Sequence, residues 1–162
     1  MNGIIRPLRL EEFPKCGNIW DIEKHAVQAA RFLAELRGGS RRTWVYERDG
    51  QFLGEISLVL EKDDPDYTIP GRRVYVSRLI IKPEERRKGI GKALTDYAVA
   101  RASEMGYAEM TIGVDLDNYP ALRLYWEEGF RELIFVGEDG DGKYCKLLKR
   151  LKGKGTEDGM SI

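Results

Sequence analysis

A basic, glycine-bearing turn between an apolar strand and a helix is the feature that most constrains the fold of this chain. Residues 74–81 are predicted to form the strand. Its second half is continuously apolar, as in strands buried on both faces, and comprises Leu79, Ile80 and Ile81. The helix that follows carries apolar residues on one side as far as Met105 and is ended by Gly106. The chain must therefore pack a helix against a sheet beside this turn.

The turn is rich in cations and places two glycines at the predicted start of the helix. It contains, in order, Arg86, Arg87, Lys88, Gly89, Ile90, Gly91 and Lys92. Glycine lets the backbone approach a ligand closely. The free N–H groups and the positive dipole end of a helix start attract an anion, and the basic side chains supply charge for a pyrophosphate or a further phosphate. A basic helix start with no ligand is the competing interpretation of the same residues.

Two familiar phosphate-binding motifs do not fit this turn. A Walker A loop needs a hydroxyl residue where this chain has Ala93, and a dinucleotide fingerprint needs a third glycine where it has Leu94. The pattern that does fit is Arg/Gln-x-x-Gly-x-Gly/Ala, which residues 86–91 match at every position.

The remaining sequence predicts further strands and helices around this centre. Pro7 marks residues 4–10 as an edge strand, and apolar residues at helical spacing predict a helix from Asp21. Asp49-Gly50 predicts a β-hairpin. Residues 61–70 are predicted to be a solvated acidic loop, and residues 110–114 a short buried strand. Asn118 is predicted to cap a helix, and two final strands are predicted over residues 130–136 and 143–148. This order predicts the α+β class, with a mixed sheet and helices packed on it.

Length and composition indicate an ordinary single-domain protein. At 162 residues the chain is long enough for one core, and we expect a domain over residues 1–151 with a disordered tail over 152–162. Lys+Arg and Asp+Glu each number 27, which argues against a nucleic-acid partner. No apolar run reaches membrane-spanning length, and Cys16 and Cys145 lack metal-ligand spacing. We expect no membrane, no metal and a cytoplasmic location.

A second motif lies about thirty residues downstream of the first. Residues 118–130 match Asn-x-x-Ala-x-x-Leu/Phe-Tyr-x-x-x-Gly-Phe at every fixed position, beginning at Asn118 and ending at Phe130. One helix and one strand separate the two motifs. With both in register, residues 4–150 resemble the GNAT superfamily of acyl-CoA-dependent N-acyltransferases.

The resemblance implies a fold, an activity and site residues. It implies a mostly antiparallel sheet with helices on both faces, splayed at the central strand to admit CoA. It implies an enzyme that transfers an acetyl group from acetyl-CoA, its cosubstrate, to a primary amine. The implied cofactor-binding residues are the strand residues 79–81, the turn residues 86–92 and Asn118, while Tyr125 is the implied general acid for the CoA thiolate. Without the motif, Tyr125 would be interpreted as a core residue shared with Leu122 and Trp126 on one helix face.

The general base and the acceptor are not identified by the motifs. The positions where some family members carry a carboxylate fall on Tyr75 and Gly113. Glu55, Asp115 and Asp117 are the nearest carboxylates, and a water chain is an equal alternative. His25 is expected to flank a helix. The acceptor amine, on a small molecule or a protein, is unidentified, and a homodimer and a longer acyl group are both left open.

Residues 137–142 hold three acids and are predicted to form a loop. This loop suggests either a polycationic acceptor or only a hairpin turn. A non-catalytic acyl-CoA sensor or scaffold of the same fold is the alternative function.

Overall fold

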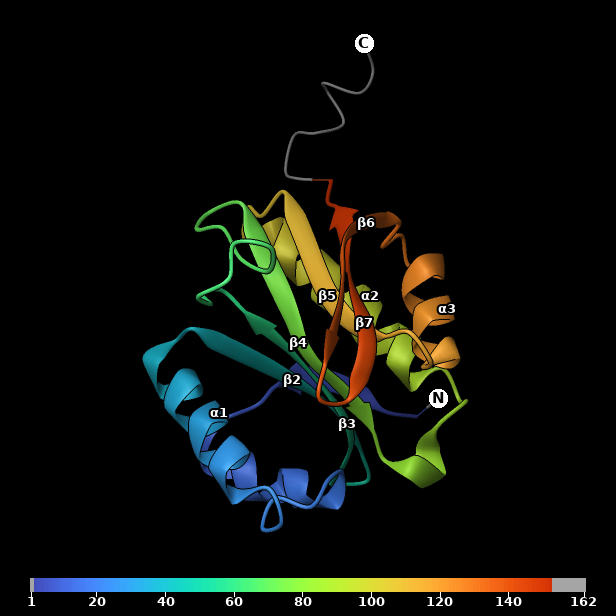
Figure 1. The fold of residues 1–162 in the computed structure, drawn as a ribbon. Helices are drawn as coiled ribbons and strands as arrows, with labels where there is room; N and C mark the ends of the chain where they lie inside the picture. Colours follow the sequence, from blue (N-terminus) through green and yellow to red (C-terminus); the bar gives the residue numbers. More distant parts are fainter. Residues whose placement is uncertain (1, 153–162) are drawn as a thin grey trace. The chain divides into compact units, whose positions relative to one another are not determined.

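The computed structural model of the chain describes residues 2–152, so the predicted tail lies outside the described residues except for Lys152 (Figure 1). Within the described residues the chain forms two compact units. The first contains residues 2–59 and 78–98, and the second contains residues 60–77 and 99–152. The strand β4 (Arg73–Ile81) and the helix α2 (Ile90–Glu104) each contribute to both units.

The first unit is built on strands in the order β1-β2-β3-β4. The strand β1 (Ile4–Pro7) pairs antiparallel with β2 (Arg41–Arg48), which pairs antiparallel with β3 (Gln51–Val59). The predicted hairpin between β2 and β3 is confirmed: Asp49 and Gly50 both have positive φ, at 53° and 77°, as a two-residue hairpin turn requires. Pro7 lies on the edge strand, as predicted.

Helices cover both faces of the first unit's strands. On one face a 3₁₀ helix, Leu10–Asn18 (η1), and the α-helix α1 (Ala26–Gly38) bury a largely aromatic cluster that includes Phe13, Trp20, Phe32 and Phe52. On the other face, α2 packs close to β3 because Gly54 has no side chain there. A Cβ at Gly54 would lie 3.2 Å from Leu94 Cδ1 and 2.8 Å from Ile81 Cδ1.

Two sequence predictions for the N-terminal segment are wrong: the first strand ends at Pro7 rather than at residue 10, and α1 begins at Ala26 rather than Asp21. The 3₁₀ helix η1 was not predicted. The reason for the late start is a local turn at Asp21. Its carboxylate accepts the Lys24 N–H at 3.0 Å, and its carbonyl lies 2.9 Å from His25 Nδ1. These contacts hold residues 21–25 in a turn that ends before the helix.

The second unit is built on strands in the order β4-β5-β7-β6. The strand β5 (Glu109–Asp115) runs parallel to β4, and their ladder extends from Arg73 opposite Glu109 to Val76 opposite Ile112. The strands β6 (Glu132–Asp139) and β7 (Gly142–Arg150) complete an antiparallel arrangement with β5. The helix α3 (Tyr119–Glu127) follows β5. The predicted α+β class with a mixed, mostly antiparallel sheet is therefore confirmed. Among the described residues no helix is long and apolar enough to cross a membrane.

Candidate functional site

The glycine turn lies in the first unit, between the end of β4 and the start of α2. A short 3₁₀ helix, Pro83–Glu85 (η2), follows β4, and Arg87 and Gly89 then adopt left-handed backbone with φ of 63° and 89°. The helical ladder begins here, since the Ala93 N–H donates to the Gly89 carbonyl at 3.1 Å. The first N–H groups of any helix lack intrahelical acceptors. The turn therefore presents backbone donors and the positive end of α2 together, as an anion site requires.

The four basic side chains of this turn, Arg86, Arg87, Lys88 and Lys92, are all exposed. Arg86 Nε donates to the Ile81 carbonyl at 3.1 Å, Lys88 lies 3.4 Å from Glu85, and Lys92 lies 2.9 Å from Asp96. The two ion pairs, those of Lys88 and Lys92, lie on the surface, so they are weak and compete poorly with a polyanion. The turn can therefore offer several cations to one phosphorylated ligand.

Glu85, just before the turn, is bound to strand β2. Its Oε1 accepts a hydrogen bond from Arg48 Nη2 at 2.9 Å, which ties η2 to β2. Partial desolvation acts to raise the pKa of Glu85, but the hydrogen bond from Arg48 and the nearby Lys88 together hold that pKa below its usual value. Lys82, just before η2, is also fixed, because its Nζ donates to Asn18 Oδ1 at 3.0 Å. Side-chain hydrogen bonds therefore hold Lys82 and Glu85, the residues just before the turn, in place.

The end of β4 supplies the remaining predicted cofactor contacts of the first unit. Leu79, Ile80 and Ile81 are half-buried. Ile80 packs against the aromatic cluster beneath η1 and α1, whereas Ile81 points toward Gly54 and α2. The two isoleucines therefore anchor β4 on opposite faces, and the strand holds its position through side-chain packing.

Asn118 and Tyr125 lie in the second unit, on α3. Asn118 caps the helix as predicted: its Oδ1 accepts the Ala121 N–H at 3.3 Å, and Pro120 occupies the first turn. One lone pair of Oδ1 is used in this way, so the Nδ2 group and the second lone pair of Oδ1 can contact a ligand.

Tyr125 is buried to 6% exposure and lies with its ring centroid 5.7 Å from that of Phe130. Burial, and secondly the Tyr75 phenol, raise the pKa of Tyr125 well above that of a free tyrosine. Its hydroxyl therefore keeps its proton at neutral pH, as a proton donor must. The interpretation of Leu122 and Trp126 as fellow core residues is wrong for Trp126, which is 54% exposed.

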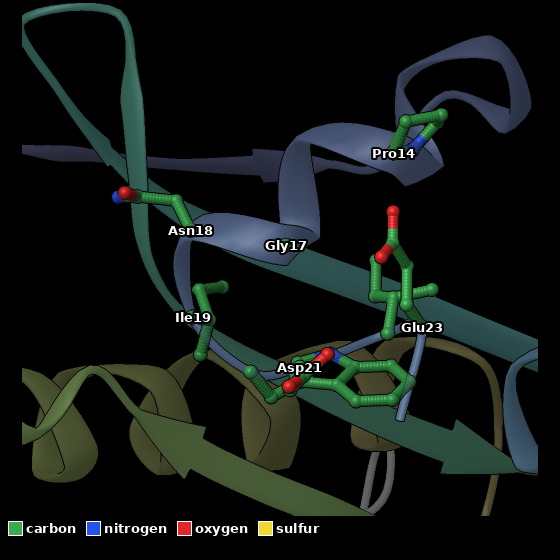
Figure 2. Close-up of a pocket in the computed structure, with 8 residues that line it drawn as sticks. Pro14, Gly17, Asn18, Ile19, Asp21 and Glu23 are labelled. Carbon is green, nitrogen blue, oxygen red and sulfur yellow. The ribbon is translucent and has the colours of Figure 1, made fainter. Parts of the chain in front are cut away.

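Glu55, one of the three open base candidates, has a structural partner in the first unit. It is 3% exposed and accepts the Trp20 Nε1 hydrogen at 2.7 Å. Burial raises the pKa of Glu55, against the opposing charge of Arg78. Trp20 also lines a cavity of about 560 Å³ formed by η1 and the turn after it (Figure 2). Glu55 thus fixes one wall of this cavity.

The other two candidate carboxylates are not buried, and neither is His25. Asp115 and Asp117 are exposed, at the end of β5 and in the turn before α3. His25 is exposed and flanks the start of α1, as predicted. Within the described residues, no group of three or more His, Cys, Asp or Glu side chains is placed to hold a metal ion.

The acidic loop before β4 is not simply solvated, so that prediction is wrong for two of its acids. Asp64 and Asp66 bind Lys146 Nζ at 3.1 and 3.0 Å. They fix the loop so that the Tyr67 ring lies 4.2 Å from the ring of Tyr75. The sequence did not identify Tyr67 as a candidate site residue. The available signal was Lys146, a cation inside a predicted apolar strand, which requires acidic partners when buried.

The six-residue acidic loop near the C-terminus is shorter than predicted. β6 continues to Asp139 and β7 begins at Gly142, so only Gly140 and Asp141 form the turn. The Asp139 carboxylate accepts the Asp141 N–H at 2.9 Å. The Asp139 carboxylate therefore has a backbone partner, and all three acids, Glu138, Asp139 and Asp141, are exposed.

Both motifs thus occupy regular positions, one at the start of α2 and one along α3. The model of the acetyltransferase (GNAT) family matches residues 5–130. The chain belongs to the GNAT acetyltransferase family. The match covers both motifs, all of β4 and the whole of α3.

Characterised relatives align with part of this chain. N-acetyltransferase family 8 member 3 of Rattus norvegicus is 32% identical over 89 residues, which is 55% of this chain and 38% of that protein. The peptidyl-lysine N-acetyltransferase YiaC of Escherichia coli K12 is 30% identical over 98 residues, 60% of this chain and 56% of that protein. The chain therefore spans well under two thirds of the length of either relative.

Solved structures confirm the GNAT fold. A phosphinothricin acetyltransferase from Sinorhizobium meliloti, in complex with acetyl-CoA, superposes with a TM-score of 0.74 at 21% identity and covers 96% of this chain and 92% of its own. An aminoglycoside 6'-acetyltransferase type Ii superposes with a TM-score of 0.73 at 15% identity and covers 91% and 96%. At these identities the likeness shows the fold alone.

Proposed function

We propose that this protein is an N-acetyltransferase that transfers an acetyl group from acetyl-CoA to a primary amine by direct attack. The observation that carries the proposal is the turn at Gly89. Its left-handed backbone, the start of α2 and the exposed basic side chains coincide at one point. That combination suits a pyrophosphate. Family membership supports the same cosubstrate, since relatives of this fold are solved with acetyl-CoA or CoA bound.

The proposed cosubstrate contacts follow the family pattern residue by residue. The backbone of Leu79, Ile80 and Ile81 would receive the pantetheine arm, and a strand N–H in this segment would stabilise the developing oxyanion. Residues 86–92 would hold the pyrophosphate. The free amide of Asn118 would contact the cosubstrate near its pantetheine part.

Tyr125 would supply a proton in the chemical step. The neutral amine forms a C–N bond with the thioester carbonyl carbon, the C–S bond breaks, and the thiolate takes the Tyr125 proton. The amine nitrogen loses its proton to water, and the Tyr125 phenolate regains a proton from solvent. The general base is not assigned: Glu55, which accepts a hydrogen bond from Trp20, the exposed Asp115 and Asp117, and a water chain are the alternatives.

The acceptor is proposed to be cationic in solution. The exposed acids of the β6–β7 hairpin support this class, because clustered carboxylates raise the local concentration of cations. A lysine side chain of a protein is one form of such an acceptor, since the bacterial relative is a peptidyl-lysine acetyltransferase. A cytoplasmic location and a homodimer are also proposals, to be tested by cell fractionation and light scattering.

Release of free thiol from acetyl-CoA tests the function. The purified protein is incubated with acetyl-CoA and separately with a lysine peptide, a polyamine, an aminoglycoside and a simple alkylamine. We expect amine-dependent thiol release above the hydrolysis rate with at least one acceptor. The same reactions with longer acyl-CoA donors test the preference for acetyl.

The burial of Tyr125 favours a second candidate, a non-catalytic acyl-CoA sensor in which this tyrosine only packs against Phe130. Acetyl-CoA binding with no thiol release for any amine, and with equal binding by Tyr125→Phe, would support the sensor.

A further inference from the structure

The loop between β3 and β4 carries a tyrosine into a place that a β5 side chain would otherwise fill. A Cβ built on Gly113 would lie 2.5 Å from Tyr67 Oη and 3.4 Å from Tyr67 Cζ. The Tyr67 ring also stacks on Tyr75, with ring centroids 4.2 Å apart and an interplanar angle of 31°. Tyr75 and Gly113 are the two positions at which some family members carry a carboxylate, and this chain has none at either. The Tyr67 hydroxyl fills the space that a side chain at position 113 would occupy.

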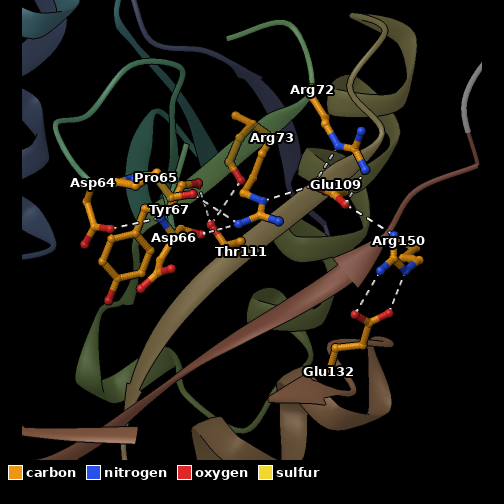
Figure 3. Close-up of polar contacts among 11 residues, drawn as sticks. Asp64, Pro65, Asp66, Tyr67, Arg72, Arg73, Glu109, Thr111, Glu132 and Arg150 are labelled. Atoms are coloured by element: carbon orange, nitrogen blue, oxygen red, sulfur yellow. Dashed lines mark hydrogen bonds and ion pairs between the residues drawn. The ribbon is translucent and has the colours of Figure 1, made fainter. Parts of the chain in front are cut away.

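Backbone contacts fix the segment that carries Tyr67 (Figure 3). Thr111 Oγ1 donates to the Tyr67 carbonyl at 2.8 Å. Arg73 Nη1 donates to the carbonyls of Pro65 and Asp66, each at 3.1 Å. Residues 65–67 are therefore tied to both β4 and β5, which is unusual for a surface loop and limits the motion of the Tyr67 side chain.

Lys146 of β7 holds the same segment from a third strand. Its side chain is 8% exposed, and its Nζ lies between the Asp64 and Asp66 carboxylates and 4.7 Å from the centroid of the Tyr67 ring. Burial acts to lower the pKa of Lys146, but its hydrogen bonds to the two aspartates outweigh burial and raise it. The cation thus stays charged and holds the tyrosine ring by a cation–π contact.

The Tyr67 hydroxyl is a neutral hydrogen-bonding group at this position. Burial, and secondly the neighbouring Tyr75, raise the pKa of Tyr67, so the phenol does not act as a base at neutral pH. Tyr75 stacks on Tyr67 and, after burial, also helps to raise the pKa of Tyr125.

We propose that the Tyr67 hydroxyl binds the acceptor amine, with the stacked Tyr67 and Tyr75 rings forming an apolar wall for the carbon chain next to the nitrogen. The proposal rests on the proposed acetyl transfer. The phenol oxygen accepts an N–H of the neutral amine and thereby orients its lone pair. The proton lost as the C–N bond forms leaves to water, and the thiolate takes the proton of Tyr125. The site therefore suits a primary amine on an unbranched alkyl chain.

Tyr67→Phe tests the role of the hydroxyl while keeping both aromatic contacts. With butylamine as the probe acceptor, we expect KM for butylamine to rise about tenfold, the scale of one lost hydrogen bond, with KM for acetyl-CoA unchanged. Tyr107→Phe removes a phenol hydroxyl from the turn between α2 and β5 and serves as the matched control with wild-type kinetics. Wild-type KM for butylamine in Tyr67→Phe would overturn the proposal.

The contact with Gly113 provides a test that separates function from packing. Gly113→Ala places its Cβ against the Tyr67 hydroxyl, so we expect a lower melting temperature and weaker acceptor use. In the Tyr67→Phe background the nearest remaining atom of residue 67 is Cζ, at 3.4 Å, an ordinary contact. The double variant should therefore regain stability but keep the high KM of Tyr67→Phe. Recovery of wild-type KM in the double variant would show that Tyr67 only packs.

Equilibrium binding of butylamine, followed by NMR without acetyl-CoA, distinguishes failure of the proposed function from failure of the amine-binding role. Binding that depends on the Tyr67 hydroxyl, in a protein that transfers no acetyl group, would refute the proposed function alone. Acetyl transfer with butylamine binding equal in wild type and Tyr67→Phe would refute the amine-binding role alone.

Discussion

Replacing Gly89 by valine should separate cosubstrate binding from stability. Gly89 has φ of 89°, a conformation in which a β-branched residue costs about 1–3 kcal/mol. If binding of acetyl-CoA requires this backbone, the variant must restore the strained conformation in order to bind. The affinity for acetyl-CoA should then fall by roughly 5- to 150-fold, the equivalent of that cost.

Gly106 provides a matched control for this prediction. It has φ of 92° at the end of α2, and a Cβ there would meet no atom within 4 Å. Gly106→Val therefore carries the same backbone strain away from the glycine turn. Thermal unfolding should show that both variants fold, and calorimetric titration should show weaker acetyl-CoA binding for Gly89→Val alone. Equal affinities in two folded variants would refute the assignment of the turn to the pyrophosphate.

Three further predictions follow from individual side chains. Tyr125→Phe should lower kcat about 10²-fold at unchanged acetyl-CoA affinity, as steady-state kinetics and calorimetry would show, whereas unchanged kcat would assign thiolate protonation to water. Glu109 is 3% exposed and is bound by Arg72, Arg73 and Arg150. Changing Glu109 to Gln should lower the free energy of unfolding at pH 7 by about 2–3 kcal/mol. Burial acts to raise the pKa of Glu109, but Arg72 and Arg73 lower it overall, so this contribution is present above about pH 4.3 and is lost as pH falls through the folded-state pKa. Denaturant titrations of wild type and Glu109→Gln should therefore converge in acid, and a constant difference would contradict the assignment. Changing Glu138, Asp139 and Asp141 to their amides should raise the acceptor KM and flatten its salt dependence. An unaltered salt dependence would show that these residues only form the hairpin turn and do not attract the acceptor.

The sequence predicted those parts of the fold that depend on local chemistry. Asp49-Gly50 defined the β2–β3 hairpin because few residues other than these tolerate two consecutive positive φ angles. Asn118 and Pro120 defined the start of α3 because a cap and a first-turn proline act within a few residues. The apolar run at Leu79–Ile81 and the glycines after it likewise placed the end of β4 and the start of α2.

The parts that the sequence did not predict depend on contacts between distant residues. Tyr67 lies at Gly113 because distant residues hold its loop: Lys146, eighty residues away from Asp66, binds that aspartate, and Thr111 binds the Tyr67 carbonyl. The helix η1 follows from the burial of Phe13 and Cys16 in a tertiary cluster, despite Pro14 within it. No pattern within a short window carries such information.

Simultaneous measurement of both products tests the central claim most directly. Wild-type protein is mixed with acetyl-CoA and the best amine of the acceptor series, and mass spectrometry quantifies the N-acetylated amine while a thiol reagent quantifies free CoA. Direct transfer predicts equal amounts of the two products, formed at a rate that Tyr125→Phe lowers about 10²-fold. Acetyl-CoA binding without an acetylated amine, for every amine class tested, would contradict the claim.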